Sequence, residues 1–179
     1  MLDLSGMALV LVASAVVACS PDGSDMRVAE VRPFRSTHTA VPVDPSDVVC
    51  PSGTAPGRTV LSGQGDPIGA YTGVATSCSR VSSSVSEELE SASFNLIAAD
   101  GDEIWFVLDG SRGGEVIVGQ GQTGNDSTVS LGAGFRIIGG TGRFASAKGS
   151  VTMAAVGGFG DTAFQATLDG VVAGPRLAQ

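Results

Sequence analysis

Few residues of this chain belong to the types that usually carry out catalysis. Its sole histidine, His38, lies in a polar segment rich in Pro, Ser and Asp, where we expect it to be solvated. That placement argues against a Ser–His–Asp triad and against a histidine-based metal site. The cysteines, at Cys19, Cys50 and Cys78, have no metal-binding spacing. We therefore predict no catalytic residue, no metal ligand and no cofactor, and we favour a role other than that of an enzyme, with catalysis as an open alternative.

Two other motifs have the letters of a binding site without its structural context. Gly119, Gly121 and Gly124 satisfy the GxGxxG pattern, but no helix is predicted after them to direct its N-terminus at a pyrophosphate. The acidic residues at 100–103 lack the remaining ligand positions of an EF-hand, so we predict a solvated hairpin turn there. The acidic run at 87–90 is predicted to be an exposed connection.

Composition limits the class of protein. The 179 residues leave room for one domain and a leader sequence. With 18 acidic against 10 basic residues, the net charge is -8 and no basic cluster is present, which argues against nucleic acid as a partner. The 26 glycines follow no three-residue period, so they indicate many tight turns and an all-β fold rather than collagen.

The N-terminus has the pattern of an export signal. Residues 7–18 form an uncharged apolar run that is shorter than the ~20 residues of a membrane-spanning helix, so residues 1–18 are predicted to be a signal peptide. Residues 16–19, VVAC, resemble the lipobox of bacterial lipoproteins, and this resemblance implies that Cys19 is acylated, for example with palmitate. Residues 1–6 contain no Lys or Arg, although a signal peptide usually begins with positive charge. The alternative is an ordinary cleaved signal peptide and a secreted protein.

The segment after Cys19 is predicted to be a tether. Residues 19–47 contain much Pro, Ser and Asp and little apolar surface to bury, which is typical of a flexible chain. The lipid and the tether would attach the folded domain, residues 48–179, to a membrane of the bacterial cell envelope. In an oxidising compartment, the remaining pair Cys50 and Cys78 predicts one disulfide, worth roughly 3 to 4 kcal/mol in the chain-entropy model. Two separate thiols are the alternative.

Apolar and polar residues alternate with a period of two through most of the folded domain. The strand around Phe94 is followed by the turn signal Asp100–Gly101 and by a strand around Phe106, which together predict a hairpin. Strands are predicted at 58–62, 69–80, 91–99, 102–109, 115–120, 129–138, 149–156 and 162–172. These short strands, without a convincing helix, indicate a sandwich or a barrel, which periodicity alone does not distinguish.

Two segments resemble one protein superfamily. Residues 92–106, ASFNLIAADGDEIWF, and residues 139–153, GGTGRFASAKGSVTM, are similar to the allene oxide cyclase and dirigent barrel superfamily, especially to its uncharacterised bacterial exported members. The resemblance spans about 59–172 and implies an all-β fold, a single eight-stranded antiparallel β-barrel. It also implies a structural corner between two strands, in which Phe144 plugs one end of the barrel. The corner residues are Gly139, Gly140, Gly142, Phe144 and Gly149. None of the superfamily's catalytic positions can be matched to a residue of this chain.

A barrel of this size either fills its interior with side chains or holds one small ligand. The residues predicted to face the interior are Phe94, Leu96, Ile104, Phe106, Leu108, Phe135, Ile137, Met153, Phe164 and Leu168. Alanines and glycines among them leave room, so we rank binding of a small apolar ligand first. An interaction protein ranks second, as a homo-oligomer or a structural envelope protein that uses an apolar exterior patch with Trp105 and Val107. A cyclase- or isomerase-like enzyme ranks third, since it needs a buried titratable group facing a cavity.

Overall fold

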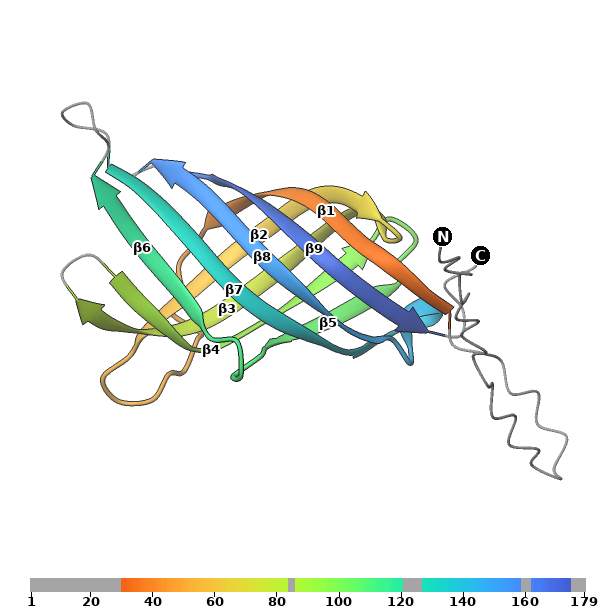
Figure 1. Ribbon diagram of the computed structural model, residues 1–179, viewed down its shortest axis with the longest axis horizontal. Helices are drawn as coiled ribbons and strands as arrows, with labels where there is room; N and C mark the ends of the chain where they lie inside the picture. Colours follow the sequence, from red (N-terminus) through yellow and green to blue (C-terminus); the bar gives the residue numbers. More distant parts are fainter. Residues whose placement is uncertain (1–29, 84–85, 121–126, 159–161, 175–179) are drawn as a thin grey trace, which may run out of the picture.

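The computed structural model describes residues 30–83, 86–120, 127–158 and 162–174. They form one antiparallel sheet and a short 3-10 turn (Figure 1). The strands are β1 (Glu30–Pro42), β2 (Ala55–Asp66), β3 (Gly69–Ser83), β4 (Ser86–Ala98), β5 (Glu103–Leu108), β6 (Gly114–Gln120), β7 (Ser127–Gly140), β8 (Lys148–Gly158) and β9 (Phe164–Gly174). The predicted signal peptide, the predicted lipidation site Cys19 and two glycines of the GxGxxG motif, Gly121 and Gly124, lie outside the described residues.

The sheet closes into a barrel. β1 pairs with β2 on one side and with the last strand, β9, on the other. β4 pairs with β5 through its residues 93–97 and with β6 through its residues 86–88. β5 and β6 therefore lie end to end and together occupy one strand position of the barrel. Both strands also pair with β7. The strands therefore fill eight positions around the barrel, and the predicted fold class, an eight-stranded antiparallel barrel, is confirmed.

The strands predicted from the sequence are all present, and most are longer than predicted. β1 is an additional strand, and it occupies residues 30–42 of the segment that the sequence predicts to be a tether. The tether prediction is wrong for these residues, so the barrel begins by residue 30 rather than at residue 48. The cause is that two inward positions of β1, Ser36 and His38, are polar and interrupt the alternation that reveals the other strands. The acidic run at 87–90 likewise lies within β4 rather than in a connection.

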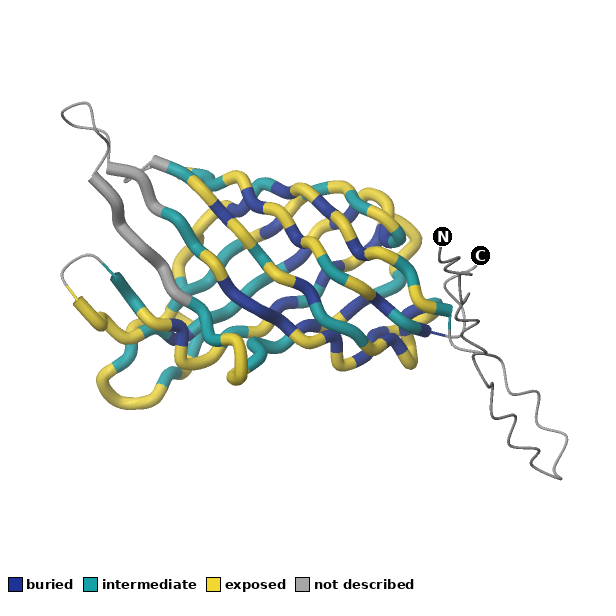
Figure 2. The backbone as a smooth tube through the Cα atoms, viewed as in Figure 1, coloured by how far each residue is buried: buried dark blue, intermediate teal, exposed yellow. Residues whose placement is uncertain are grey.

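One half of the barrel interior is packed with aromatic side chains. Phe94 stacks on Phe106 with ring centroids 4.2 Å apart. Phe135 meets Phe94 edge-on, and Phe34 meets Phe106 in the same way. Along the strands, buried positions alternate with exposed ones (Figure 2), and fully buried aliphatic residues surround the rings: Leu96, Ile104, Val151, Leu168 and Val172. This half supplies the hydrophobic core that stabilises the barrel.

The glycine corner closes the packed end. The chain turns from β7 into β8 through the 3-10 turn η1 (Gly142–Phe144), and Phe144 is fully buried, as expected for a plug. Gly142 has a φ of +52°, and a Cβ at this position would overlap the Asp102 carboxylate. That carboxylate accepts a hydrogen bond from the backbone N–H of Arg143 at 3.1 Å, which joins the corner to the hairpin between β4 and β5. The other predicted corner residues lie at the adjoining ends of β7 and β8: Gly139, Gly140 and Gly149.

Candidate ligand cavity

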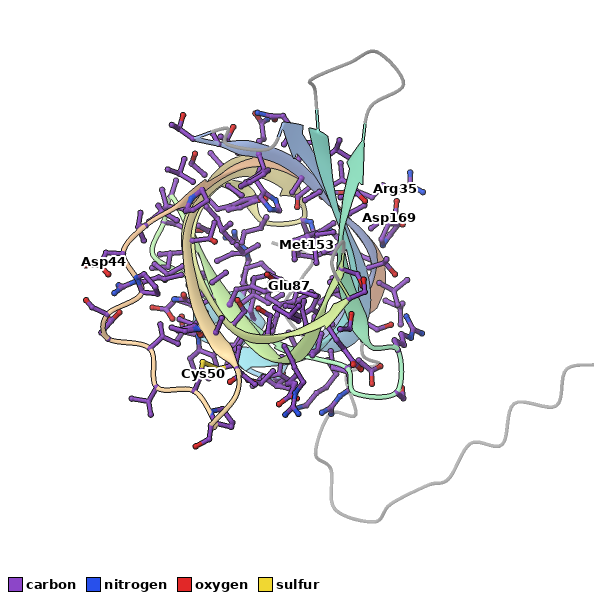
Figure 3. The ribbon with its side chains drawn as sticks, turned by 90° about the vertical axis from the view of Figure 1, so that its left-hand side faces the viewer. Arg35, Asp44, Cys50, Glu87, Met153 and Asp169 are labelled. Atoms are coloured by element: carbon purple, nitrogen blue, oxygen red, sulfur yellow. A yellow bond between two sulfur atoms is a disulfide. The ribbon has the colours of Figure 1, made fainter. Side chains whose placement is uncertain are left out.

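The other half of the barrel is hollow. A cavity of about 220 Å³ occupies it, on the side away from the glycine corner. Seen along the barrel, Met153 points inward, whereas Arg35 and Asp169 form an ion pair on the outer surface (Figure 3). Alanines from several strands line the cavity, and their small side chains account for the space: Ala40, Ala75, Ala92, Ala155 and Ala166.

The residues predicted to face the interior divide between the two halves. Those that line the cavity are Phe94, Phe135, Met153 and Phe164. Those that are buried in the packed half are Leu96, Ile104, Phe106, Ile137 and Leu168. Leu108 is partly buried against the core. The sequence left open whether the interior is packed or holds a cavity. The structure has both, because one end of the barrel interior is packed and the other end contains a cavity.

His38 is the one ionisable side chain among the described residues that line the cavity. Only 3% of it is exposed, so the prediction of a solvated histidine is wrong. Its Nδ1 lies 3.1 Å from the hydroxyl oxygen of Tyr71, and this hydroxyl donates a hydrogen bond to Ser36 Oγ at 3.0 Å. The other ring nitrogen, Nε2, is buried and has no hydrogen-bond partner. These three side chains form a buried polar network beside the cavity.

A glycine in the intervening strand makes this network possible. β2 separates β1 from β3, and its residue Gly63 is in register with both His38 and Tyr71. A Cβ at Gly63 would overlap the Thr37 carbonyl oxygen and lie 2.5 Å from the Cβ of His38, so any other residue would push β1 away from β2. The glycine therefore leaves the space across which the Tyr71 side chain reaches β1.

Burial favours the neutral forms of both rings in the network. It lowers the pKa of the His38 imidazole. It also raises the pKa of the Tyr71 phenol, against the smaller opposing effect of the hydrogen bond to Ser36. Because the phenol donates its single hydrogen to Ser36, its oxygen accepts the hydrogen of His38 Nδ1, an assignment of tautomer that rests on the hydrogen-bond pattern. In this tautomer Nε2 carries a lone pair, which is buried beside the ring without a hydrogen-bond donor.

The other described residues of the cavity wall carry no charge. Within the described ranges, no Asp, Glu, Lys or Arg lines the cavity. The acidic hairpin turn lies elsewhere, where Asp100 and Asp102 form ion pairs with Arg143. Across the part of the chain that the structure describes, no group of three or more His, Cys, Asp or Glu side chains could hold a metal ion. The cavity is therefore suited to an apolar molecule.

The barrel wall beside the cavity is interrupted. Residues 89–92 of β4 lie between the segment that pairs with β6 and the segment that pairs with β5, and in the described structure they pair with neither. An outer groove of about 470 Å³ lies along this interruption, and it shares four lining residues with the cavity: Thr76, Ser77, Ala92 and Ser93. The groove and the cavity are therefore separated only by the wall at β3 and β4.

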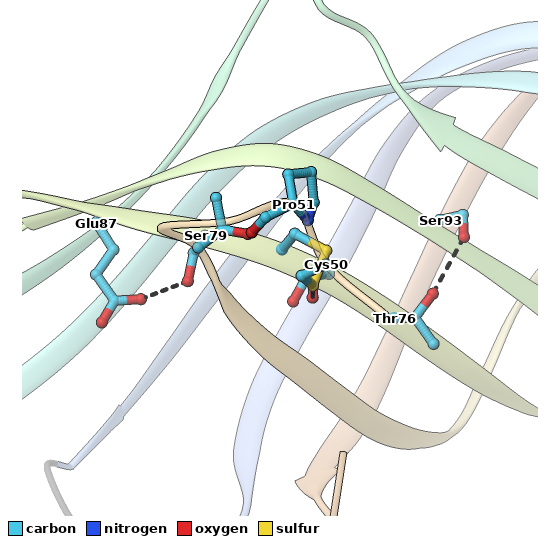
Figure 4. The surroundings of a disulfide bond; sticks show 9 residues. Cys50, Pro51, Thr76, Ser79, Glu87 and Ser93 are labelled. Carbon is cyan, nitrogen blue, oxygen red and sulfur yellow. Dashed lines mark hydrogen bonds between the residues drawn. A yellow bond between two sulfur atoms is a disulfide. The ribbon is translucent and has the colours of Figure 1, made fainter. Parts of the chain in front are cut away.

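A disulfide borders the outer groove. Cys50 and Cys78 are bonded, with Cα atoms 5.7 Å apart, so the predicted pairing is present (Figure 4). Cys50 precedes β2 and Cys78 belongs to β3, so the bond holds the segment before β2 against the outside of the wall. Close by, Ser79 of β3 donates a hydrogen bond to the Glu87 carboxylate of β4 at 2.8 Å (Figure 4).

Trp105 faces outward, as predicted. It is 39% exposed, and its Nε1 donates a hydrogen bond to the Glu103 carboxylate at 2.8 Å. Val74, Val107 and Ile138 lie beside it and line a shallow hollow on the outer surface. This group forms an apolar exterior patch. Among the described residues, no helix is long and apolar enough to cross a membrane.

No protein-family model, curated protein or solved structure matches this chain. The likeness of residues 92–106 and 139–153 to the allene oxide cyclase and dirigent superfamily stays a prediction from the sequence.

Sequence reasoning missed the polar network of Ser36, His38 and Tyr71. One signal was available, because Phe34 and Ala40 extend the same two-residue period on either side of the polar pair and all four side chains point inward. A strand with polar residues on its inner face is expected where a barrel contains a polar site.

Proposed function

We propose that this protein binds one small, largely apolar molecule inside the barrel. The alanine-lined cavity is the observation that carries the proposal. A cavity of about 150 Å³ suffices for benzene, so about 220 Å³ has room for a somewhat larger molecule. Transfer of apolar surface from water into such a site is favourable by about 25 cal/mol per Å².

Two alanines on neighbouring positions of β8 test the proposal. Ala155 lines the cavity, whereas Ala154 is exposed on the outer face of the same strand. We expect Ala155→Leu to weaken the binding of methoxycyclohexane, a compact ether, about tenfold or more by filling the cavity. The matched control Ala154→Leu should bind it as the wild-type protein does. Isothermal titration calorimetry measures both affinities, and equal affinities in the two variants, or no binding to the wild type, would contradict a ligand cavity.

We also propose that the barrel is held in the bacterial cell envelope through a lipid on Cys19. The lipobox-like sequence at 16–19 supports this, and the Cys50–Cys78 disulfide is of the kind that forms in oxidising compartments. Replacement of Cys19 by Ser should move the protein from the membrane fraction to the soluble fraction. Unchanged fractionation with an unmodified N-terminal peptide would favour the alternative, a secreted protein with an ordinary signal peptide.

A second candidate function is protein association through the exterior patch around Trp105. The exposed indole and the neighbouring Val74, Val107 and Ile138 support it, because apolar surface gathered in one place is typical of interaction sites. Replacement of Trp105 by Ser should then lower the molar mass measured by light scattering if the partner is a second copy of this chain. A wild-type protein that is monomeric at all concentrations would contradict a homo-oligomer.

Catalysis of the cyclase or isomerase type is the third candidate. His38 supports it, since a neutral imidazole with a free nitrogen can accept a proton. Catalysis would require His38 for turnover and not only for affinity. A His38 variant that converts a substrate at the wild-type rate would therefore contradict this candidate.

A further inference from the structure

One carboxylate lies on the inner face of the barrel beyond the cavity. Leu89 of β4 lines the cavity, and Glu87 is the next residue on the same face of this strand. The other end of β4 adjoins the hairpin that is bound to the glycine corner, so Glu87 lies toward the opposite end of the barrel. Seen along the barrel, Glu87 lies inside the ring of strands (Figure 3). Its carboxylate accepts a hydrogen bond at 2.8 Å from Ser79, which is paired directly with Leu89 and therefore shares its inward face.

A β-bulge turns this carboxylate inward. Ala92 and Leu89 both line the cavity although they are three residues apart, because the ladder with β3 contains a bulge between them at Glu90. The extra residue reverses the alternation that follows. Glu87 therefore continues the inward face of β4, whereas Glu88 and Glu90 are exposed. Of the acidic run at 87–90, only one side chain is directed to the interior.

The Glu87 carboxylate has no cationic partner among the described residues. Glu90 forms an ion pair with Arg80, and the remaining ion pairs of the described structure join other residues. Glu87 is only partly exposed, so its carboxylate has lost part of its hydration, and the protein offers it one neutral hydroxyl in return. A cation placed beside it would form a charge-assisted hydrogen bond and stabilise the carboxylate.

The surroundings favour an organic cation over a metal ion. A divalent metal ion requires several oxygen ligands, and the described residues contain no group of three or more His, Cys, Asp or Glu that could hold one. A protonated amine is satisfied by one carboxylate with neighbouring hydroxyl groups, such as those of Ser79 and of Ser77, which lines the cavity. We infer that, if the barrel binds a ligand as proposed, this ligand is an amphipathic cation. Its apolar part lies against the alanines of the cavity, and its protonated amine binds the Glu87 carboxylate.

The spacing of the two parts limits the length of this ligand. Two residues along a strand cover about 7 Å, so the amine lies one short linker beyond the apolar group that contacts Leu89. 3-Cyclohexylpropylamine has this form, with a compact ring for the cavity and a propyl linker to the amine. 3-Cyclohexylpropan-1-ol has the same ring and linker, but a neutral hydroxyl group replaces the ammonium group.

The amine and the alcohol test the inference together. We expect the wild-type protein to bind the amine about tenfold more tightly than the alcohol near neutral pH, because hydrogen bonds between charged groups are the stronger ones. In Glu87→Gln, which keeps the shape of the side chain without its charge, the two compounds should bind about equally. Glu88→Gln is the matched control, since it removes the same charge from the adjacent, exposed residue, and it should keep the preference for the amine. Calorimetric titration gives the six affinities.

Two further measurements locate the ligand. 4-Cyclohexylbutanoate presents a carboxylate to Glu87, so the wild-type protein should bind it more weakly than the alcohol, and this comparison needs no variant that folds. Ala155→Leu should weaken the binding of the amine and of the alcohol by the same factor, because the ring occupies the cavity in both complexes. An amine that binds this variant as it binds the wild type would lie elsewhere on the acidic surface, and the inference would be overturned.

The outcomes separate this inference from the proposed function. Equal affinities of the wild-type protein for amine and alcohol would overturn the assignment of Glu87 while the ligand cavity stands. A preference for the amine that falls equally in Glu87→Gln and Glu88→Gln would do the same, since it would report the net charge of -8 rather than one carboxylate. If neither compound binds the wild-type protein up to about 1 mM, both the inference and the proposed function are overturned.

Discussion

The buried histidine should make the stability of this barrel depend on pH near neutrality. His38 is neutral in the folded protein, and burial lowers the pKa of its imidazole below the ordinary value of 6.5. In the unfolded chain the ring is exposed to water and binds its proton at the ordinary pKa. Between the two pKa values the unfolded state therefore holds more protons than the folded state. The free energy of unfolding is then highest above pH 6.5 and falls as the pH decreases toward the folded pKa.

The size of the effect follows from one proton. A single group changes the free energy of unfolding by at most about 1.4 kcal/mol per pH unit. The nearest ionisable partner, Tyr71, stays a neutral phenol in this range, because burial raises its pKa. Asp100 and Asp109 do not add to the slope, because hydrogen bonds hold the pKa values of both carboxyl groups below 3.8. The chain has no second histidine to add to the slope.

Urea denaturation between about pH 5 and pH 7.5 measures this dependence. We expect a decrease of the midpoint below about pH 6.5 with an unchanged m-value, and a flat profile in His38→Gln, whose amide does not titrate. A flat wild-type profile would refute the reasoning, because it would mean that His38 is exposed and that residues 30–42 are the tether that the sequence suggests. The same slope in the variant would assign the effect to other groups.

Three further substitutions test the fold and the polar network. Gly142→Val should destabilise the barrel by about 3 to 5 kcal/mol, because it combines a positive φ with displacement of the Asp102 carboxylate, and thermal unfolding should show a loss of about 10 °C or more. Tyr71→Phe should cost about 1 to 3 kcal/mol in urea denaturation, since it leaves two buried polar groups without their partner. Joint replacement of Cys50 and Cys78 by Ala should cost about 3.5 kcal/mol for the 28-residue separation that the disulfide closes, again measured by urea denaturation.

The glycine substitution has a matched control in Gly132. A Cβ at this position of β7 meets no atom within 4 Å, so Gly132→Val should leave the melting temperature nearly unchanged. Equal melting temperatures for the Gly142 and Gly132 variants would contradict the account of the corner. An unaltered urea midpoint after loss of the tyrosine hydroxyl, or of the disulfide, would contradict the respective prediction.

The sequence was sufficient for the parts of the fold that depend on local patterns. The alternation around Phe94 and Phe106 and the Asp100–Gly101 turn predict a hairpin, and the structure contains it. The two cysteines after Cys19 predict a disulfide, which is also present. The closure of the sheet depends on β1, whose partners β2 and β9 lie far along the chain: Glu30 pairs with Gly174, 144 residues further on. Two of the four inward residues of β1, Ser36 and His38, are polar, so the hydrophobic alternation is interrupted there.

The candidate site was hidden for the same reason. His38 was isolated in the sequence among residues typical of a flexible segment, and its partner Tyr71 lies 33 residues further along the chain. Only the register of β1, β2 and β3 brings the two side chains together, with Gly63 of β2 between them. Nothing in the sequence around Gly63 predicts this role. A polar network assembled across three strands cannot be deduced from periodicity, which reports the environment of each strand separately.

The division of the barrel into a packed half and a hollow half separates the residues that hold the fold from those that can touch a ligand. Substitutions in the aromatic pair of Phe34 and Phe106 act on close-packed atoms, where each lost methylene destabilises the protein. An alanine such as Ala155 borders empty space, so a larger side chain there changes the shape of the cavity with little effect on the core. Over evolution, a barrel of this design can change the shape of its cavity by single substitutions at one end while the other end preserves the fold.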